Sequence, residues 1–150
     1  MPGAPTRHSL TMRSDPEELG RMRAWLREVM AAYPNAEEET SALLTAAGEL
    51  CTNAIKHAYE GQAGQPIELR LDAFDDRVVL QIEDFGTSFN PERYKPPDLE
   101  SRPEHGMGLF IVRSLMDAFE MDVARPRGTR WTLTKYVGRS ASGAPGDKRP

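Results

Sequence analysis

The sequence predicts an α+β fold, a two-layer sandwich in which a mixed, mainly antiparallel sheet is covered on one face by helices. Apolar residues recur at helical spacing in two segments of the first half of the chain. Further along, apolar and polar residues alternate on both sides of the turn at Asp75 and Asp76. Helices and strands are therefore mixed rather than strictly alternating. The length of 150 residues is that of one domain.

The first residues predict a strand followed by a helix. Residues 6–12 suit a short edge strand. Ser14 is a candidate helix cap, because proline and acidic residues follow it in the first turn. The apolar positions of the helix that follows are Leu19, Met22, Trp25, Leu26 and Val29. Residues 33–35 break this helix, and Asn35 with Glu38 three positions later predicts the cap of a second helix.

A long helix and a hairpin are predicted next. The apolar side of the helix consists of Leu43, Leu44, Ala47, Leu50, Ala54 and Ala58. After a loop at residues 61–66, apolar and polar residues alternate over 67–73 and again over 78–84, as in half-buried strands. Because only a tight turn separates these two segments, we expect them to pair as a β-hairpin.

The remaining chain begins with a loop at residues 90–105 that is rich in proline and charge. Such a long loop inside one domain is typical of a functional lid or of a disordered segment. A helix is expected over 108–120, with Phe119 on its apolar face. Two more strands are expected over 121–124 and 129–137.

Composition excludes several classes of function. A net charge of −4 gives no basic footprint for nucleic acid. No apolar run reaches the roughly 20 residues that span a bilayer, and the N-terminus lacks the apolar core of a signal peptide. The single cysteine, Cys51, permits no internal disulfide and is expected to be a small buried hydrophobe. We therefore expect one cytoplasmic domain at 1–137, with a flexible start at 1–5 and a disordered tail at 138–150.

One face of the long helix has residues suited to a site for metal and phosphate. Glu49, Asn53 and His57 are spaced four residues apart and would stack, with Lys56 beside them. An asparagine oxygen suits Mg²⁺, which keeps waters and substrate phosphates. Glu49 can accept a proton from a hydroxyl nucleophile, while Lys56 and His57 can meet phosphate oxygens. Taken alone, the pattern favours an ordinary solvated helix face.

A second group lies at the end of the second hairpin strand. Asp84 can accept a hydrogen bond from an exocyclic amine, and Gly86 would let a flat base approach the main chain. Phe89 could close such a pocket. Taken alone, the Asp-x-Gly sequence favours a turn that merely ends the strand.

The third group is Gly106-Met107-Gly108, followed by Leu109, at the predicted start of the third helix. Glycines there leave main-chain N–H groups free to bind anions, and the helix dipole helps. Taken alone, the pair is equally a flexible cap, and without Gly-Lys-Ser/Thr it is not a P-loop. Together, however, the three groups stand in order on a helix, a strand end and a helix start, and this conjunction predicts a nucleotide site.

In order and residue type, the three groups resemble the N, G1 and G2 boxes of the Bergerat-fold (GHKL, histidine-kinase-like) ATPases, over about residues 5–137. Within that superfamily the chain is similar to the anti-sigma-factor serine/threonine kinases, also through Leu-Phe-Ile-Val-Arg-Ser-Leu-Met-Asp at 109–117. The resemblance implies that Glu49 is the catalytic base. The residues that it implies for ATP, with Asn53 as the Mg²⁺ ligand, are Asn53, Lys56, His57, Asp84, Gly86, Phe89, Gly106, Met107, Gly108, Leu109 and Thr129.

The resemblance also implies how the rest of the site is completed. Thr129 would help to seat adenine through water, and residues 90–105 would form a lid over the phosphates. Two positions depart from the family pattern, because Ser88 and His105 stand where glycine is common. We expect the serine to narrow the base pocket, and the four prolines of the lid to limit its motion.

The function that the resemblance implies is that of an anti-sigma factor with kinase activity. Such proteins sequester a sigma factor, phosphorylate a serine on a STAS-type anti-anti-sigma partner with MgATP, and form homodimers. Arg21 stands where a partner-contacting arginine is expected. The alternative is a nucleotide-gated switch of the same fold without phosphotransfer, although a pure binder would not need Glu49. A histidine-kinase ATP domain fits less well, because no helix pair with a phosphoacceptor histidine is recognisable.

Overall fold

The structure is a computed structural model that describes residues 3–87, 107–123 and 127–138. Its elements are, in chain order, β1 (Thr6–Arg13), α1 (Glu18–Met30), α2 (Glu37–Asn53), η1 (Ala54–Ala58), β2 (Pro66–Ala73), β3 (Arg77–Asp84), α3 (Met107–Leu115), β4 (Ala118–Asp122) and β5 (Thr129–Tyr136). The element η1 is a short π-helical segment that continues α2 directly. The predictions for the lid at 90–105 and for the tail lie outside the described residues.

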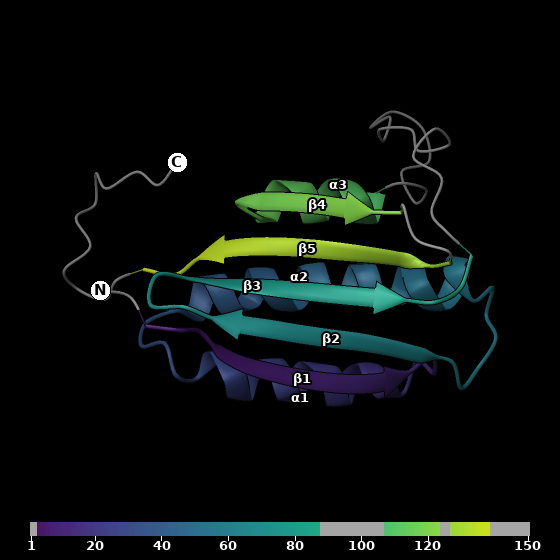
Figure 1. Ribbon diagram of the computed structural model, residues 1–150, viewed down its shortest axis with the longest axis horizontal. Helices are drawn as coiled ribbons and strands as arrows, with labels where there is room; N and C mark the ends of the chain where they lie inside the picture. Colours follow the sequence, from purple (N-terminus) through teal and green to yellow (C-terminus); the bar gives the residue numbers. More distant parts are fainter. Residues whose placement is uncertain (1–2, 88–106, 124–126, 139–150) are drawn as a thin grey trace.

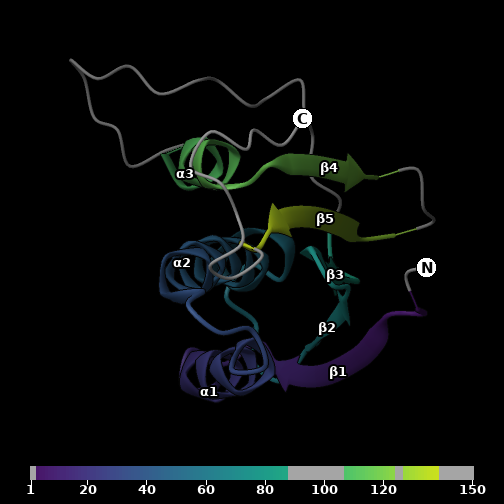
Figure 2. The same ribbon diagram turned by 90° about the vertical axis from the view of Figure 1, so that its left-hand side faces the viewer.

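The strands of these described ranges form one sheet in the order β1-β2-β3-β5-β4 (Figure 1). All four neighbouring pairs are antiparallel, so the α+β class is confirmed, but the sheet is not mixed among these strands. The helices lie together on one face of it (Figure 2). The predicted hairpin is β2–β3, in which Ile67 at the start of β2 lies opposite Asp84 at the end of β3.

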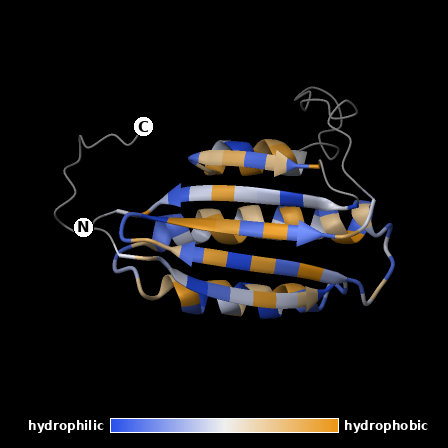
Figure 3. Cartoon of the chain, in the orientation of Figure 1, coloured by the Kyte–Doolittle hydropathy of each residue, from blue (hydrophilic) through white to orange (hydrophobic). Residues whose placement is uncertain are grey.

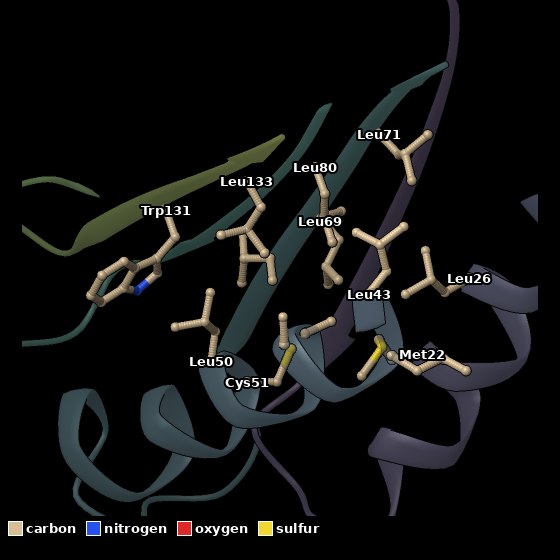
Figure 4. Close-up of a cluster of buried hydrophobic side chains, with 14 of the residues drawn as sticks. Met22, Leu26, Leu43, Leu50, Cys51, Leu69, Leu71, Leu80, Trp131 and Leu133 are labelled. Carbon is tan, nitrogen blue, oxygen red and sulfur yellow. The ribbon is translucent and has the colours of Figure 1, made fainter. Parts of the chain in front are cut away.

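A single apolar core fills the space between the sheet and the helices. The strands show the predicted alternation of apolar and polar residues (Figure 3). In Figure 4, side chains of α1 and α2, among them Leu26 and Leu43, meet Leu69 and Leu80 of the hairpin. Cys51 is fully buried there, and burial raises the pKa of its thiol to about 12. It is the small buried hydrophobe that the sequence predicts.

Both predicted helix caps are wrong. α1 begins at Glu18, and Ser14 makes no cap bond. Instead, the buried Ser14 hydroxyl donates to the Gln62 carbonyl at 2.7 Å and accepts from the Gln65 N–H at 2.8 Å. α2 likewise begins at Glu37 without a side-chain cap. The cap prediction depends only on residues within a few positions, whereas the partners of Ser14 lie 48 and 51 residues away.

The helix predicted over 108–120 is too long, and the strand predicted over 121–124 begins too late. α3 ends at Leu115, whose carbonyl accepts from Lys135 Nζ of β5 at 2.7 Å. Phe119 belongs to β4, and its ring stacks on that of Trp131 in β5 with centroids 5.4 Å apart. Phe119 and Met121 also fit the spacing of two that is typical of a strand. These residues therefore pair with β5 instead of extending α3.

Candidate functional site

The end of β3 places a buried carboxylate at the open end of the hairpin. Asp84 is 4% exposed and lies opposite Thr129 of β5. Its Oδ1 accepts from the Gly86 N–H at 3.1 Å, and the Thr129 N–H also donates to the carboxylate. Burial raises the pKa of this carboxyl from its usual 3.8 to about 6, although both hydrogen bonds lower it. Because a carboxylate has about four acceptor positions, two backbone donors leave capacity for an exocyclic amine.

Two glycines allow three separate chain segments to meet at this strand end. A Cβ on Gly86 would overlap the Ala58 carbonyl of η1, and a Cβ on Gly128 would overlap the Asp84 carbonyl. Gly128 also has a φ of +94°, which side chains rarely adopt. The sequence prediction for Gly86 concerned a base, but the structure adds a close approach of η1. Gly128 was not predicted as a site residue.

The first and third sequence motifs meet between α2 and α3. Glu49 of α2 lies against the first turn of α3, where a Cβ on Gly108 would be only 2.5 Å from Glu49 Oε1. The carboxylate therefore occupies space that any side chain at position 108 would fill. This places the predicted base beside the helix start predicted to bind phosphate. Leu109, the next residue, is 8% exposed and belongs to the core cluster.

The remaining predicted residues of the long helix lie at the end of α2 and in η1. Asn53 ends α2 one turn after Glu49 and is half-buried, while Lys56 and His57 of η1 are exposed. In η1 the Tyr59 N–H bonds to the Ala54 carbonyl, five residues back, at 2.9 Å. The backbone therefore departs from α-helical geometry directly after Asn53. Their roles toward metal and phosphate stay predictions.

The other predicted residues are divided between the described and undescribed parts of the chain. Thr129 is 2% exposed beside Asp84, and Met107 begins α3. Phe89 and Gly106 lie outside the described residues. Arg21 lies on α1, where its Nη1 donates to the Thr11 carbonyl and to Glu18 Oε1, both at 3.0 Å. Within the described ranges, no cluster of three His, Cys, Asp or Glu residues is arranged to hold a metal ion.

None of the predicted site residues that the structure describes lines the cavity of about 860 Å³ at the other end of the hairpin. That cavity is lined by residues of β1, of α1 and the segment after it, and of the turn after β2, among them Trp25, Tyr33 and Phe74. The chemistry of the carboxylate and glycine positions, rather than cavity size, identifies the candidate site. Within the part of the chain that the structure describes, no helix has the length and apolar character needed to cross a membrane.

Comparisons with known proteins show the family of the chain. Residues 12–135 match the family described as "Histidine kinase-like ATPase domain". "Serine-protein kinase RsbW" of Bacillus pumilus is 32% identical over 135 residues, which cover 83% of this chain and 82% of that protein. The protein of the same name from Bacillus subtilis is 30% identical over 132 residues, which cover 83% and 81%.

A solved structure supports the fold. It is described as the crystal structure of the RsbU and RsbW domains of Rv1364c from Mycobacterium tuberculosis. Its TM-score is 0.64 at 18% identity, and the match covers 88% of this chain and 32% of that chain. At this identity the likeness concerns the fold alone.

Proposed function

We propose that this chain sequesters a sigma factor and phosphorylates a serine of a STAS-type anti-anti-sigma partner. The chain belongs to the histidine kinase-like ATPase family and, within it, to the anti-sigma-factor serine kinases. It is a protein-serine kinase that uses ATP. The observation that supports phosphotransfer, rather than nucleotide binding alone, is the contact of Glu49 with Gly108. This contact holds a carboxylate beside the helix start where phosphates would bind.

At the base end of the site, Asp84 would accept the exocyclic amine of adenine. Its carboxylate is buried and oriented by two backbone N–H groups, so its remaining acceptor positions point in fixed directions. Thr129, buried beside it, would help to seat the base. A desolvated carboxylate discriminates strongly between a donor and an acceptor on the base, because an unpaired buried group is costly.

At the phosphate end, bound MgATP would supply the phosphoryl group and neutralise the charge that develops during transfer. Asn53 would hold the metal together with phosphate oxygens and waters. Glu49 would accept the proton of the partner's serine hydroxyl as the serine oxygen bonds to the γ-phosphorus and the bond to the β-phosphate oxygen breaks. Its half-buried position beside Gly108 supports this role, because the helix start proposed to bind phosphate lies there.

The partner surface is proposed to include Arg21. Its side chain is 55% exposed, and its guanidinium donates to the Thr11 carbonyl of β1 and to Glu18 of α1. An exposed cation in a fixed place suits an acidic group on a partner. We also propose that the chain forms a homodimer, as the resemblance implies.

The proposed kinase activity is tested with Glu49→Gln, which removes the base but keeps the shape. We expect phosphotransfer to fall by roughly 10²–10⁴-fold while ATP affinity changes little. Wild type and variant are incubated with Mg²⁺, γ-labelled ATP and a soluble extract of the host. The expected product is a small protein that contains labelled phosphoserine.

Glu38→Gln is the matched control, because Glu38 is an exposed acid near the start of the same helix. It should transfer phosphate like the wild type. Normal transfer by Glu49→Gln would remove Glu49 from the role of base. Absence of label with the wild type, in a preparation that binds ATP, would instead favour the nucleotide-gated switch.

A further inference from the structure

Consecutive peptide groups at the end of β3 are held by residues that lie far away in the sequence. The N–H of Phe85 donates to the Tyr59 hydroxyl at 2.8 Å. The carbonyl of Phe85 accepts from Arg127 Nε, also at 2.8 Å. The N–H of Thr87 donates to the Ala58 carbonyl at 2.8 Å. The turn is therefore fixed by η1 on one side and by the segment before β5 on the other.

The second of these peptide groups also orients the predicted base-binding carboxylate. A peptide group is planar, so the Phe85 carbonyl and the Gly86 N–H move together. Arg127 holds the carbonyl, and the Gly86 N–H donates to Asp84 Oδ1 at 3.1 Å. Any rotation of the main chain at Phe85 would therefore withdraw a donor from the Asp84 carboxylate.

The hydroxyl of Tyr59 has a defined direction. It donates its one proton to the Pro66 carbonyl at 2.6 Å, so a lone pair faces the Phe85 N–H. The side chain is 7% exposed, and burial raises the pKa of the phenol, which therefore stays protonated. Tyr59 thus ties the end of β3 to the start of β2 through one buried group.

The π-helical geometry of η1 brings these groups to the strand end. The Tyr59 N–H bonds five residues back to the Ala54 carbonyl, so the backbone is wider here than in an α-helix. The Ala58 carbonyl points toward Gly86 and Thr87, and the Tyr59 ring also lies against Gly86. Gly86 has no room for a Cβ against this carbonyl. Single π-helical turns recur at functional sites, because they redirect groups in this way.

We propose that Tyr59 is a positioning residue for base recognition, which orients the Asp84 carboxylate through the Phe85 main chain and so sets the preference for adenine over a base with a carbonyl at the same position. Arg127 holds the same main chain from the opposite side. This inference rests on the proposed function, in which Asp84 accepts the exocyclic amine. Tyr59 itself touches neither the base nor the phosphates in this mechanism.

The test compares ADP with IDP, whose base has a carbonyl where adenine has an amine. Dissociation constants of both nucleotides are measured by calorimetry for the wild type and for Tyr59→Phe, which keeps the ring and removes both hydrogen bonds. We expect the preference for ADP over IDP to fall by about tenfold, because a buried hydrogen-bond network is broken. We also expect the Phe85 amide to exchange its hydrogen faster in the nucleotide-free variant.

Tyr33→Phe is the matched control. The Tyr33 hydroxyl donates to the Phe74 carbonyl at 2.5 Å, at the opposite end of β2, so this variant loses a comparable bond far from the site. Its preference for ADP should equal that of the wild type. If Tyr59→Phe does not fold, Arg127→Met replaces it, because this exposed side chain releases the same main chain from the other side.

The outcomes separate this inference from the proposed function. If the wild type prefers ADP, Asp84→Asn loses that preference and Tyr59→Phe keeps it, the inference is wrong and the function stands. Equal weakening of ADP and IDP in Tyr59→Phe would also overturn it, since a purely structural role affects both nucleotides alike. A wild type that binds neither nucleotide, or both equally, would contradict the proposed function itself.

Discussion

The two ends of the β2–β3 hairpin share one feature, a tyrosine hydroxyl bonded to the main chain, but differ in the segments that make their other contacts. At each end a tyrosine hydroxyl donates to a carbonyl of β2 or of the residue after it, Tyr59 to Pro66 at 2.6 Å and Tyr33 to Phe74 at 2.5 Å. At the turn end the Asp76 carbonyl also accepts from the Val137 N–H at 3.0 Å, and the other contacts lie within the turn. The Phe74 N–H donates to the Arg77 carbonyl at 2.9 Å, and the Arg77 guanidinium lies 4.3 Å from the centre of the Phe74 ring.

The open end is closed by segments that are remote in the sequence. The end of β3 contacts Tyr59, which follows η1 and lies 26 residues before Phe85, and Arg127, 42 residues after it. The turn makes one backbone hydrogen bond within itself and receives one bond each from Tyr33 and Val137. The hydrogen-bonding groups of an open strand end must be satisfied by other segments. The side chains that these segments bring together can bind a ligand. The comparison gives a physical reason for placing the proposed nucleotide site at the open end, even though a cavity of about 860 Å³ lies at the other.

The largest expected effect comes from adding one methyl group where the segments of the open end meet. Gly128→Ala places a Cβ against the Asp84 carbonyl at a positive φ of +94°. We expect the free energy of unfolding to fall by about 3 kcal/mol, because overpacking adds to backbone strain. Urea denaturation measures the loss.

Gly64→Ala provides the matched comparison. Gly64 has a similar φ of +79°, but a Cβ there would meet nothing within 4 Å. The backbone strain alone should cost about 1 kcal/mol. Equal losses in the two variants would mean that the close approach of Gly128 to β3 does not constrain the open end.

A smaller effect is expected from the buried charge. Asp84 has a folded-state pKa of about 6 against a usual 3.8, so the folded protein binds more protons between these values. Its contribution to stability is therefore greatest at low pH and is lost as the pH rises through about 6. Asp84→Asn removes this pH dependence, so the free energy of unfolding of the variant relative to the wild type should rise by about 2 kcal/mol from pH 4 to pH 7.

The same variant should lose its preference for ADP, so stability and function change in opposite directions. Asparagine has only one acceptor oxygen, and when that oxygen faces the Gly86 and Thr129 N–H groups, its amide faces the amine of the base. Urea denaturation of the wild type and the variant at several pH values gives the difference. A difference that stays constant from pH 4 to pH 7 would show that burial does not shift this carboxyl.

Much of the fold could be predicted from the sequence, because the signals are local. The strands at β2 and β3 follow an alternation of two, and Asp84 and Gly86 stand where that alternation ends. The predictions that failed concern competition between segments. Ser14 binds the loop before β2 instead of capping α1, and Phe119 pairs in β4 instead of extending α3.

The candidate site shows the same division. Glu49 and Gly108 could be predicted as chemistry, but their mutual contact depends on how α2 and α3 pack. Tyr59, Arg127 and Gly128 were missed, and for Tyr59 and Arg127 nothing in the neighbouring sequence indicates a role. Each acts on a peptide group of β3 that only the folded chain brings near. A glycine followed by the start of β5 was the one signal that pointed to a close approach.

The smallest expected effect tests the comparison most directly, because the two variants each remove one exposed or half-exposed arginine, one from each end of the hairpin. Arg77→Met loses an ion pair with Asp76 of 2.9 Å and the contact with the Phe74 ring. Such pairs near the surface contribute about 0–1 kcal/mol, so stability should change little and the affinity for ADP not at all. Arg127→Met should cost as little in stability, yet lower the affinity for ADP. The carbonyl that Arg127 holds belongs to the peptide group that orients Asp84. Calorimetry with ADP on both variants makes the comparison, and equal affinities would mean that the open end keeps its geometry without Arg127.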